Sequence, residues 1–113
     1  MTNTEEFCVV FATVNGEEQG MAIARAVVEE KLAACASMVG PIRSVYWWDG
    51  KVQDEPEMLL VMKTTRSLFG KLRDAIVKIH SYEVPEIIAL PIVDGHAPYL
   101  SWIADSASQP NGQ

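Results

Sequence analysis

Side chains that could bind a metal ion are spread along the chain and form no local motif. Copper binds tightly to thiolate and imidazole groups, and Cu(I) favours sulfur. By type, the candidate ligands are Cys8, Cys35, Glu57, His80, Glu86 and His96. No Cys-x-x-Cys or His-x-x-x-His pair occurs. Any metal site must therefore be assembled in space, and we expect it to be shared between subunits.

Each thiol and imidazole also has an ordinary structural interpretation. Cys8 lies in an apolar run and is interpreted as a small buried hydrophobe. Cys35 follows the first expected helix, where a packed core thiol explains it as well as a ligand role. His80 ends the apolar face of the second helix and could cap its C-terminus, where a cation is favoured. His96 sits beside a glycine in a loop and is expected to be solvated.

Four aromatic residues could either pack in the core and at interfaces or line a cleft for a small organic ligand. They are Tyr46, Trp48, Tyr82 and Trp102. Glu57 and Lys63 lie six residues apart in one expected strand, so their side chains share a face. Because charged groups near a core must be paired, we expect an ion-pair network beneath such a cleft, which Glu86 could join.

The motifs of common enzyme classes are absent. The sequence contains no Gly-x-Ser-x-Gly, no Gly-rich phosphate loop and no metalloprotease histidine pair. A nucleophile pair of Cys35 and His80 is conceivable, but nothing in the sequence places the two within reach. We therefore expect a protein that is not an enzyme.

The composition predicts one acidic globular domain. The chain has 113 residues, a net charge of −6 and 49% hydrophobic residues, and its pI is about 4.8. An acidic surface disfavours nucleic acid and anionic membranes as partners and suits cations. The start of the chain lacks the features of a signal peptide, and no stretch approaches a membrane span, so we expect a cytoplasmic protein with free thiols.

The first half of the chain predicts a strand, a helix and a long hairpin. The apolar run Phe7–Thr13 is typical of a buried strand. Helical spacing of apolar residues follows over about 17–32, with Asn15 and Glu18 resembling a capping box. Strands over 36–48 and 51–63 are then joined by Asp49-Gly50, a pair that favours a type I′ turn. We expect a bend or an edge position at Pro41, and a bulge or an unpaired edge position at Pro56.

The second half predicts a helix, a strand and a short terminal helix. Thr64-Thr65 offers an N-cap to a second helix that ends before the loop 80–85. A fourth strand is expected over 86–93, and Pro98 begins a C-terminal helix. We expect one domain over 1–113, with an ordered core at about 7–105 and a frayed tail over 106–113.

The order β-α-β-β-α-β with a terminal helix predicts an α+β, ferredoxin-like fold. One antiparallel sheet would carry both helices on one face and leave the other face to be covered. The hairpin is long, and its tip carries Tyr46, Trp47 and Trp48, which one small domain cannot easily bury. We expect subunits to extend one another's sheets through this hairpin. The alternative is that the C-terminal helix alone covers the free face.

Five sequence blocks together resemble the CutA1 divalent-cation-tolerance family. They are Lys31-Leu32-Ala33-Ala34-Cys35, Ser44-x-Tyr46-x-Trp48-x-Gly50-Lys51, Glu57 with Lys63-Thr64, His80-x-Tyr82-x-x-Pro85-Glu86, and Tyr99-Leu100-Ser101-Trp102. The resemblance extends from about Cys8 to Ile103. Five blocks in order at matching spacings make it specific.

The resemblance implies a cytoplasmic homotrimer with a link to tolerance of copper and other divalent ions. The resemblance favours Cys35 as a metal ligand, and by residue type we expect His80 and Glu57 to join it. It also implies a trimer shape similar to that of PII signalling proteins, with clefts between subunits. The alternative function is therefore a PII-like sensor or scaffold that binds a small metabolite or a partner protein. Its cleft residues would be Tyr46, Trp48, Lys63, Tyr82, Glu86 and Trp102.

The chain departs from the family pattern at three positions. Ser81 stands where the family often has proline between the histidine and the tyrosine. Ala12 and Ile79 stand where some copper-binding members have cysteine and histidine. A metal site that uses those two positions therefore does not transfer to this chain.

Overall fold

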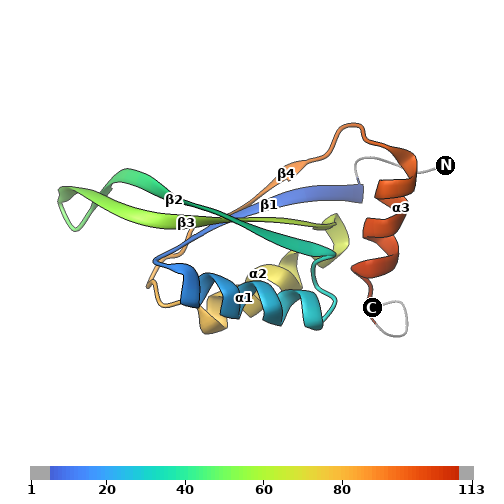
Figure 1. Cartoon of the computed structure of the whole chain (residues 1–113), viewed down its shortest axis with the longest axis horizontal. Helices are drawn as coiled ribbons and strands as arrows, with labels where there is room; N and C mark the ends of the chain where they lie inside the picture. The colour runs from blue at the N-terminus through green and yellow to red at the C-terminus, as the bar shows by residue number, and fades with distance from the viewer. Residues whose placement is uncertain (1–5, 110–113) are drawn as a thin grey trace.

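The computed structural model describes residues 6–109 and confirms the expected element order (Figure 1). The elements are β1 (Phe7–Val14), α1 (Glu17–Glu29), β2 (Cys35–Trp48), β3 (Lys51–Thr65), the short 3₁₀ helix η2 (Arg66–Leu68), α2 (Phe69–Ile79), β4 (Ile87–Pro91) and α3 (Ala97–Ser106). The four strands form one antiparallel sheet in the order β2-β3-β1-β4. Within the described range, no helix is both long and apolar enough to cross a membrane.

Helices α1 and α2 cover one face of the sheet (Figure 1). Side chains alternate across a strand, and β1 directs Val10, Ala12 and Val14 into the core on this face. They pack with residues of both helices, including Ile23 of α1 and Ile76 of α2. The period-two pattern of the strands and the helical spacing of the apolar residues therefore meet in one hydrophobic core.

The opposite face of the sheet is covered at one end only. Leu100 and Ile103 of α3 pack there in a second cluster with Phe7 of β1, and Figure 1 shows α3 at that end of the sheet. Farther along, Ile88 and Leu90 of β4 stay exposed. In a single chain the C-terminal helix alone therefore does not cover this face.

The β2–β3 hairpin extends far beyond the rest of the sheet (Figure 1). β1 pairs with β3 only as far as Val14 opposite Met58. β2 follows β3 all the way to Trp48 opposite Lys51. The molecule consequently measures 48 × 26 × 21 Å along its principal axes.

The turn and proline predictions for this hairpin are confirmed. Asp49 and Gly50 have φ angles of 55° and 74°, and a type I′ turn needs positive φ at both central residues. β2 is an edge strand whose register with β3 shifts around Pro41. Pro56 lies beyond the last residue that β1 pairs, where one side of β3 has no neighbouring strand.

Helix α1 is shorter than the pattern predicts, ending at Glu29 instead of at about residue 32. Lys31 takes a left-handed conformation, with φ of 61°, and turns the chain away from the helix axis. The amides of Leu32 and Ala33 then donate to the carbonyl oxygen of Val27, at 2.9 and 3.2 Å. Leu32 is buried because this turn sends it into the core.

The side-chain caps expected for the first two helices are not formed, although Thr65 is the N-cap residue of η2, which leads into α2. Gly16, not Asn15, is the N-cap of α1, and no side chain caps either α1 or α2. Thr65 precedes η2 in an extended conformation, and α2 begins only after that turn. The Thr64 hydroxyl instead donates to the carbonyl oxygen of Leu32 at 2.7 Å in the protein interior.

Strand β4 is also shorter than expected, spanning Ile87–Pro91 instead of 86–93. It pairs with β1 alone, and that pairing runs from Cys8 opposite Pro91 to Ala12 opposite Ile87. One further backbone bond, from the Ile92 N–H to the carbonyl oxygen of Phe7 at 3.1 Å, continues the contact with β1 beyond the strand.

Part of the segment expected to be a frayed tail, 106–113, is held in place. Ala107 is buried in the cluster beneath α3. The Gln109 side chain donates from Nε2 to the carbonyl oxygen of Glu30 at 2.9 Å, at the end of α1. The remaining residues of the expected tail, 110–113, lie outside the described range.

Replacing the buried Thr64 hydroxyl with a methyl group should destabilise the fold. In Thr64→Val the carbonyl oxygen of Leu32 loses its partner, which costs about 1–3 kcal/mol for a buried group. The matched control is Thr65→Val, whose hydroxyl contacts Ser67 at the exposed surface, and it should cost less than about 0.5 kcal/mol. Urea unfolding curves measure both. If the two variants unfolded at the same urea concentration, the hydrogen bond from Thr64 to Leu32 would not stabilise the fold as proposed.

Candidate functional site

A cavity of about 680 Å³ opens between the β2–β3 hairpin and the loop that follows α2. We call it the hairpin cleft. Its lining residues are Thr13 of β1, Ser44, Val45, Tyr46, Trp47 and Trp48 of β2, Glu57 of β3, and Tyr82, Glu83, Val84 and Glu86 of the loop. The lining thus combines aromatic and acidic side chains and contains no basic residue.

Glu57 is the most unusual group in the hairpin cleft because it is a buried acid. It is only 6% exposed, and its Oε2 accepts a hydrogen bond from the Tyr82 hydroxyl at 2.6 Å. Among residues 6–109, the ion pairs lie elsewhere and none includes Glu57. Burial of a carboxylate is costly unless it is paired, so this group is suited to receive a positive charge.

Tyr82 supplies the one donor to this carboxylate. Burial of the ring raises the pKa of the Tyr82 phenol well above its usual range, and the hydrogen bond to the Glu57 carboxylate raises the pKa further. The Tyr82 ring also packs against the His80 ring, with 4.7 Å between centroids. The phenol therefore stays protonated and remains a donor to Glu57.

Both ring nitrogens of His80 are used within the protein. Nδ1 accepts from the backbone N–H of Tyr82 at 3.0 Å, so this nitrogen carries no proton. Nε2 then donates to the backbone carbonyl of Thr13 at 2.7 Å. The buried imidazole is held in one tautomer and fixes the loop against β1. It therefore offers no free lone pair to a metal ion.

The loop that carries Tyr82 is also fastened to α1. The Gln19 side chain accepts from the backbone N–H of Ser81 at 3.0 Å and from its hydroxyl at 2.6 Å. Gln19 Nε2 donates to the carbonyl oxygen of Ile79 at 3.1 Å. Ser81, with a backbone N–H and a hydroxyl that a proline lacks, makes two of these three bonds. The wall of the hairpin cleft formed by this loop is consequently preformed.

The three residues expected to bind metal are not brought together within one chain. Cys35 lies at the α3 end of the sheet, with its Sγ 3.9 Å from the Tyr99 hydroxyl. It pairs with Lys63, six residues along β3 from Glu57, which corresponds to about 20 Å along the strand. In the described part of the chain, no three Cys, His, Asp or Glu side chains are grouped so that they could hold a metal ion.

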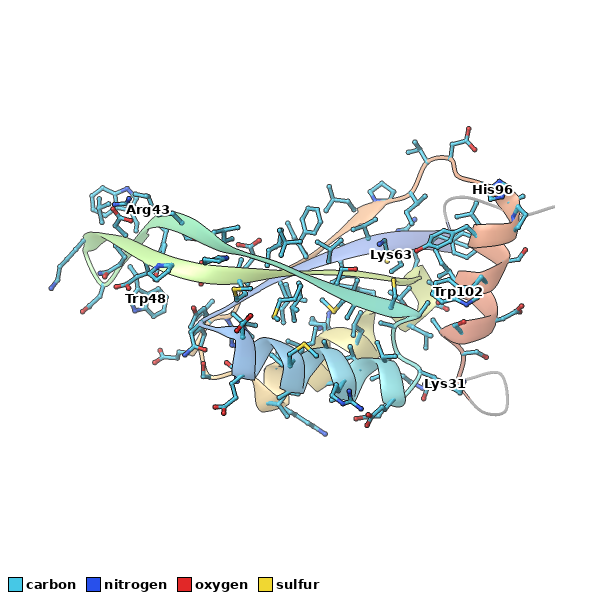
Figure 2. All side chains as sticks on the ribbon, viewed as in Figure 1. Lys31, Arg43, Trp48, Lys63, His96 and Trp102 are labelled. Carbon is cyan, nitrogen blue, oxygen red and sulfur yellow. The ribbon has the colours of Figure 1, made fainter. Side chains whose placement is uncertain are left out.

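The expected cleft residues divide into two groups. Tyr46, Trp48, Tyr82 and Glu86 line the hairpin cleft. Lys63 and Trp102 lie at the other end of the sheet beside α3, far from Trp48 (Figure 2). The expected ion pair of Glu57 with Lys63 is therefore not formed within the described chain.

Several lining residues were missed by the sequence analysis as members of a site. Trp47 was expected only as an exposed aromatic residue, yet it lines the hairpin cleft together with both of its neighbours. Glu83 could have been predicted as a lining residue, because it directly follows Tyr82, a residue already expected in the cleft. Ser44 also carried a signal, since it begins a block that supports the family resemblance. Thr13 carried none, because neither its type nor its spacing distinguishes it from other strand residues.

Comparisons with known proteins agree with one another. The family described as "CutA1 divalent ion tolerance protein" matches residues 8–106. The "Divalent-cation tolerance protein CutA" of Thermus thermophilus is 46% identical over 98 residues, which cover 87% of this chain and 95% of that protein. "Protein CutA 1, chloroplastic" of rice is 46% identical over 101 residues, 89% of this chain.

Solved structures give the same result. The Thermus thermophilus divalent cation tolerance protein has a TM-score of 0.88 at 44% identity, covering 90% of this chain and 99% of that chain. CutA1 from Oryza sativa has a TM-score of 0.88 at 46% identity, covering 93% and 96%. The chain spans only 57% of the curated rice protein.

Because its pKa is raised, Tyr82 should lose its proton only at high pH, and the stability of the fold should fall there. A phenol whose pKa is raised by folding stabilises the native state fully below the unfolded pKa of about 10, and this contribution is lost as the pH rises through the folded pKa. Glu57→Gln removes the neighbouring charge, so Tyr82 should ionise at lower pH, although burial still delays it. Alkaline titration of the tyrosinate absorbance measures this shift. Tyr82→Phe should remove the part of the absorbance rise that occurs at the highest pH. An unchanged titration curve in both variants would show that this part of the curve does not come from Tyr82 beside Glu57.

Proposed function

The chain belongs to the CutA1 divalent ion tolerance protein family, and from this membership we propose that it binds divalent metal ions, copper among them, in the hairpin cleft. The observation that carries the proposal is the buried carboxylate of Glu57, which has one neutral donor and no cationic partner within the described chain. A divalent cation entering the cleft would supply the missing positive charge. The net charge of −6 favours its approach.

Within one chain, the hairpin cleft offers a metal ion carboxylate oxygens that do not converge into a closed site among the described residues. Glu57, Glu83 and Glu86 offer carboxylate oxygens, which are typical ligands of hydrated divalent cations. Copper also seeks sulfur and nitrogen, and within one chain Cys35 is distant while His80 is occupied. We therefore propose weak binding through oxygen, with any contribution of Cys35 to a copper site coming from another subunit.

We also propose that the protein is a homotrimer. The sheet face opposite α1 and α2 is covered at one end only, and Ile88 and Leu90 are exposed on it. The hairpin adds Trp47, which is 74% exposed. Exposed apolar surfaces of this kind mark interfaces. Among residues 6–109, no strand pairs with the outer edges of β2 and β4, so these edges could pair with strands of other copies.

A second candidate function is that of a PII-like sensor or scaffold whose cleft binds a small metabolite or a partner protein. The observation that favours it is the size and lining of the hairpin cleft. Its volume of about 680 Å³ is typical of small-molecule sites, and aromatic side chains form much of its wall. A bare metal ion would leave most of this volume to water.

The proposal includes no catalytic step, and it places the protein in the cytoplasm. The names of the relatives describe ion tolerance and not a reaction. Cys8 and Cys35 are free thiols, which is the state that the reducing cytoplasm maintains.

Divalent-ion binding should depend on Glu57. We expect calorimetric titration with Cu(II) and Zn(II) to give dissociation constants below about 1 mM, and Glu57→Gln to weaken them several-fold because it removes the buried charge. Asp105→Asn, on α3 at the other end of the molecule, is the matched control and should bind as the unmodified chain does. Absence of binding to either ion, in either redox state of copper, would refute the proposal.

The oligomeric state should depend on the uncovered sheet face. Light scattering should give about three times the chain mass of 12.5 kDa. Ile88→Glu places a charge on that face and should reduce the mass to that of one chain. Val77→Glu, on α2, introduces the same charge at a position of similar exposure, 50% against 48%, and should leave the mass unchanged. A single-chain mass for the unmodified protein would rule out the trimer.

A further inference from the structure

We propose that Asn15 and Gly16 form a site of spontaneous covalent modification, at which the side-chain amide of Asn15 is converted to a carboxylate. The two residues form the turn between β1 and α1. Figure 1 shows this turn at the end of the helix layer that lies away from α3. The reacting atoms belong to neighbouring residues of one chain, so the reaction needs neither a bound metal ion nor a second subunit.

The reaction joins the main chain to the preceding side chain. The backbone nitrogen of Gly16 loses its proton and attacks Cγ of Asn15, and the bond from Cγ to Nδ2 breaks as ammonia leaves. The resulting succinimide ring is then opened by water. Attack of water on the former side-chain carbonyl gives aspartate, and attack on the main-chain carbonyl gives isoaspartate. No oxidant, reductant or cofactor takes part, and the neutral amide becomes an acid.

The first argument is that the Asn15 side chain is not held in place. An asparagine at the start of a helix commonly caps the helix with its side-chain oxygen. Here Gly16 takes the N-cap position, and no side chain caps α1. The Asn15 side chain is exposed and makes no hydrogen bond within residues 6–109. It can therefore rotate until Cγ meets the Gly16 nitrogen, as an attack geometry requires.

The second argument is that the attacking nitrogen lies between two hydrogen-bonded ladders. The pairing of β1 with β3 stops at Val14, and α1 begins at Glu17. The carbonyl oxygen of Gly16 accepts from the Gly20 N–H at 3.0 Å, whereas the Gly16 N–H donates to no group of the described chain. This nitrogen can lose its proton without breaking a hydrogen bond of the fold.

The third argument is the space around Gly16. A Cβ atom placed there would meet no atom within 4 Å, so nothing crowds a ring that forms at this point. The Asp94-Gly95 pair is different. A Cβ at Gly95 would lie 3.1 Å from the Leu100 side chain, and the Gly95 N–H already donates to Asp94 Oδ1 at 2.8 Å.

The position of the turn gives the modification a structural consequence. Two residues before the turn, the carbonyl oxygen of Thr13 accepts from His80. Further along, the Gln19 side chain accepts from the backbone N–H and the hydroxyl of Ser81. Isoaspartate routes the main chain through the side chain and adds one methylene group between these two anchors. We therefore expect it to loosen the loop after α2, whereas the aspartate product adds a charge and leaves the main chain unchanged.

The test follows the full chain during storage at body temperature and mildly alkaline pH. Peptide mapping by mass spectrometry measures the converted fraction at Asn15 and separates the aspartate and isoaspartate products. It also keeps Asn15 apart from the second Asn-Gly pair, 111–112, which lies outside the described range. We expect both products at Asn15, formed at a rate within several-fold of that in a synthetic peptide of residues 8–22.

Two variants assign the reaction and its effect. Gly16→Ala should slow the conversion several-fold because the methyl group hinders the attack. It should keep the urea midpoint of the unmodified chain, since the added Cβ meets nothing and the φ of 176° is extended backbone. Amide hydrogen exchange at Ser81 and Tyr82 should be faster in the stored protein than in fresh protein. Freshly purified Asn15→Asp, which carries the charge alone, should exchange as the unmodified chain does.

Several results would overturn the inference. An Asn15 that stays intact while the synthetic peptide converts would show that the fold or a neighbouring subunit protects the turn. Aspartate without isoaspartate would exclude the succinimide, and an unchanged rate in Gly16→Ala would exclude the proposed role of glycine. Unchanged hydrogen exchange in converted protein would reject the loosening of the loop.

Discussion

The hydrogen bond from the Tyr82 hydroxyl to Glu57 connects the two halves of the site. Glu57 lies on β3 just beyond the last residue paired by β1, where the sheet narrows to the two-stranded hairpin. Among the hydrogen bonds of residues 6–109, this is the only one between side chains that joins the hairpin to the loop after α2. Glu57 and Tyr82 both line the hairpin cleft, so the shape of the cleft depends on the position of Tyr82.

The position of Tyr82 depends in turn on a chain of neutral hydrogen bonds. Thr13 accepts from His80, His80 accepts from the amide of Tyr82, and Gln19 holds the intervening Ser81. All of these donors are neutral, so none compensates the charge of Glu57. The described chain therefore gives this carboxylate one neutral donor and no cationic partner.

The sequence predicted the fold because its signals are local and periodic. Alternation in the strands, helical spacing in α1 and α2, and the Asp49-Gly50 turn each act over a few residues, and each appears in the structure. The site was predicted only in part because it depends on distances along strands. Lys63 and Glu57 belong to the same strand, yet Lys63 lies at the α3 end of the sheet and Glu57 lies where the sheet narrows to the hairpin, about 20 Å away along β3. His80 resembled a ligand by type, but only the folded chain shows that Thr13 and Tyr82 occupy both of its nitrogens.

Within one chain, the hairpin cleft offers a divalent ion a buried carboxylate that has no cationic partner among the described residues. A metal ion needs several donors at fixed distances, and one chain presents a single buried carboxylate with two more at the cleft wall and its thiol about 20 Å away. Tight metal binding would therefore require ligands from another copy of the chain.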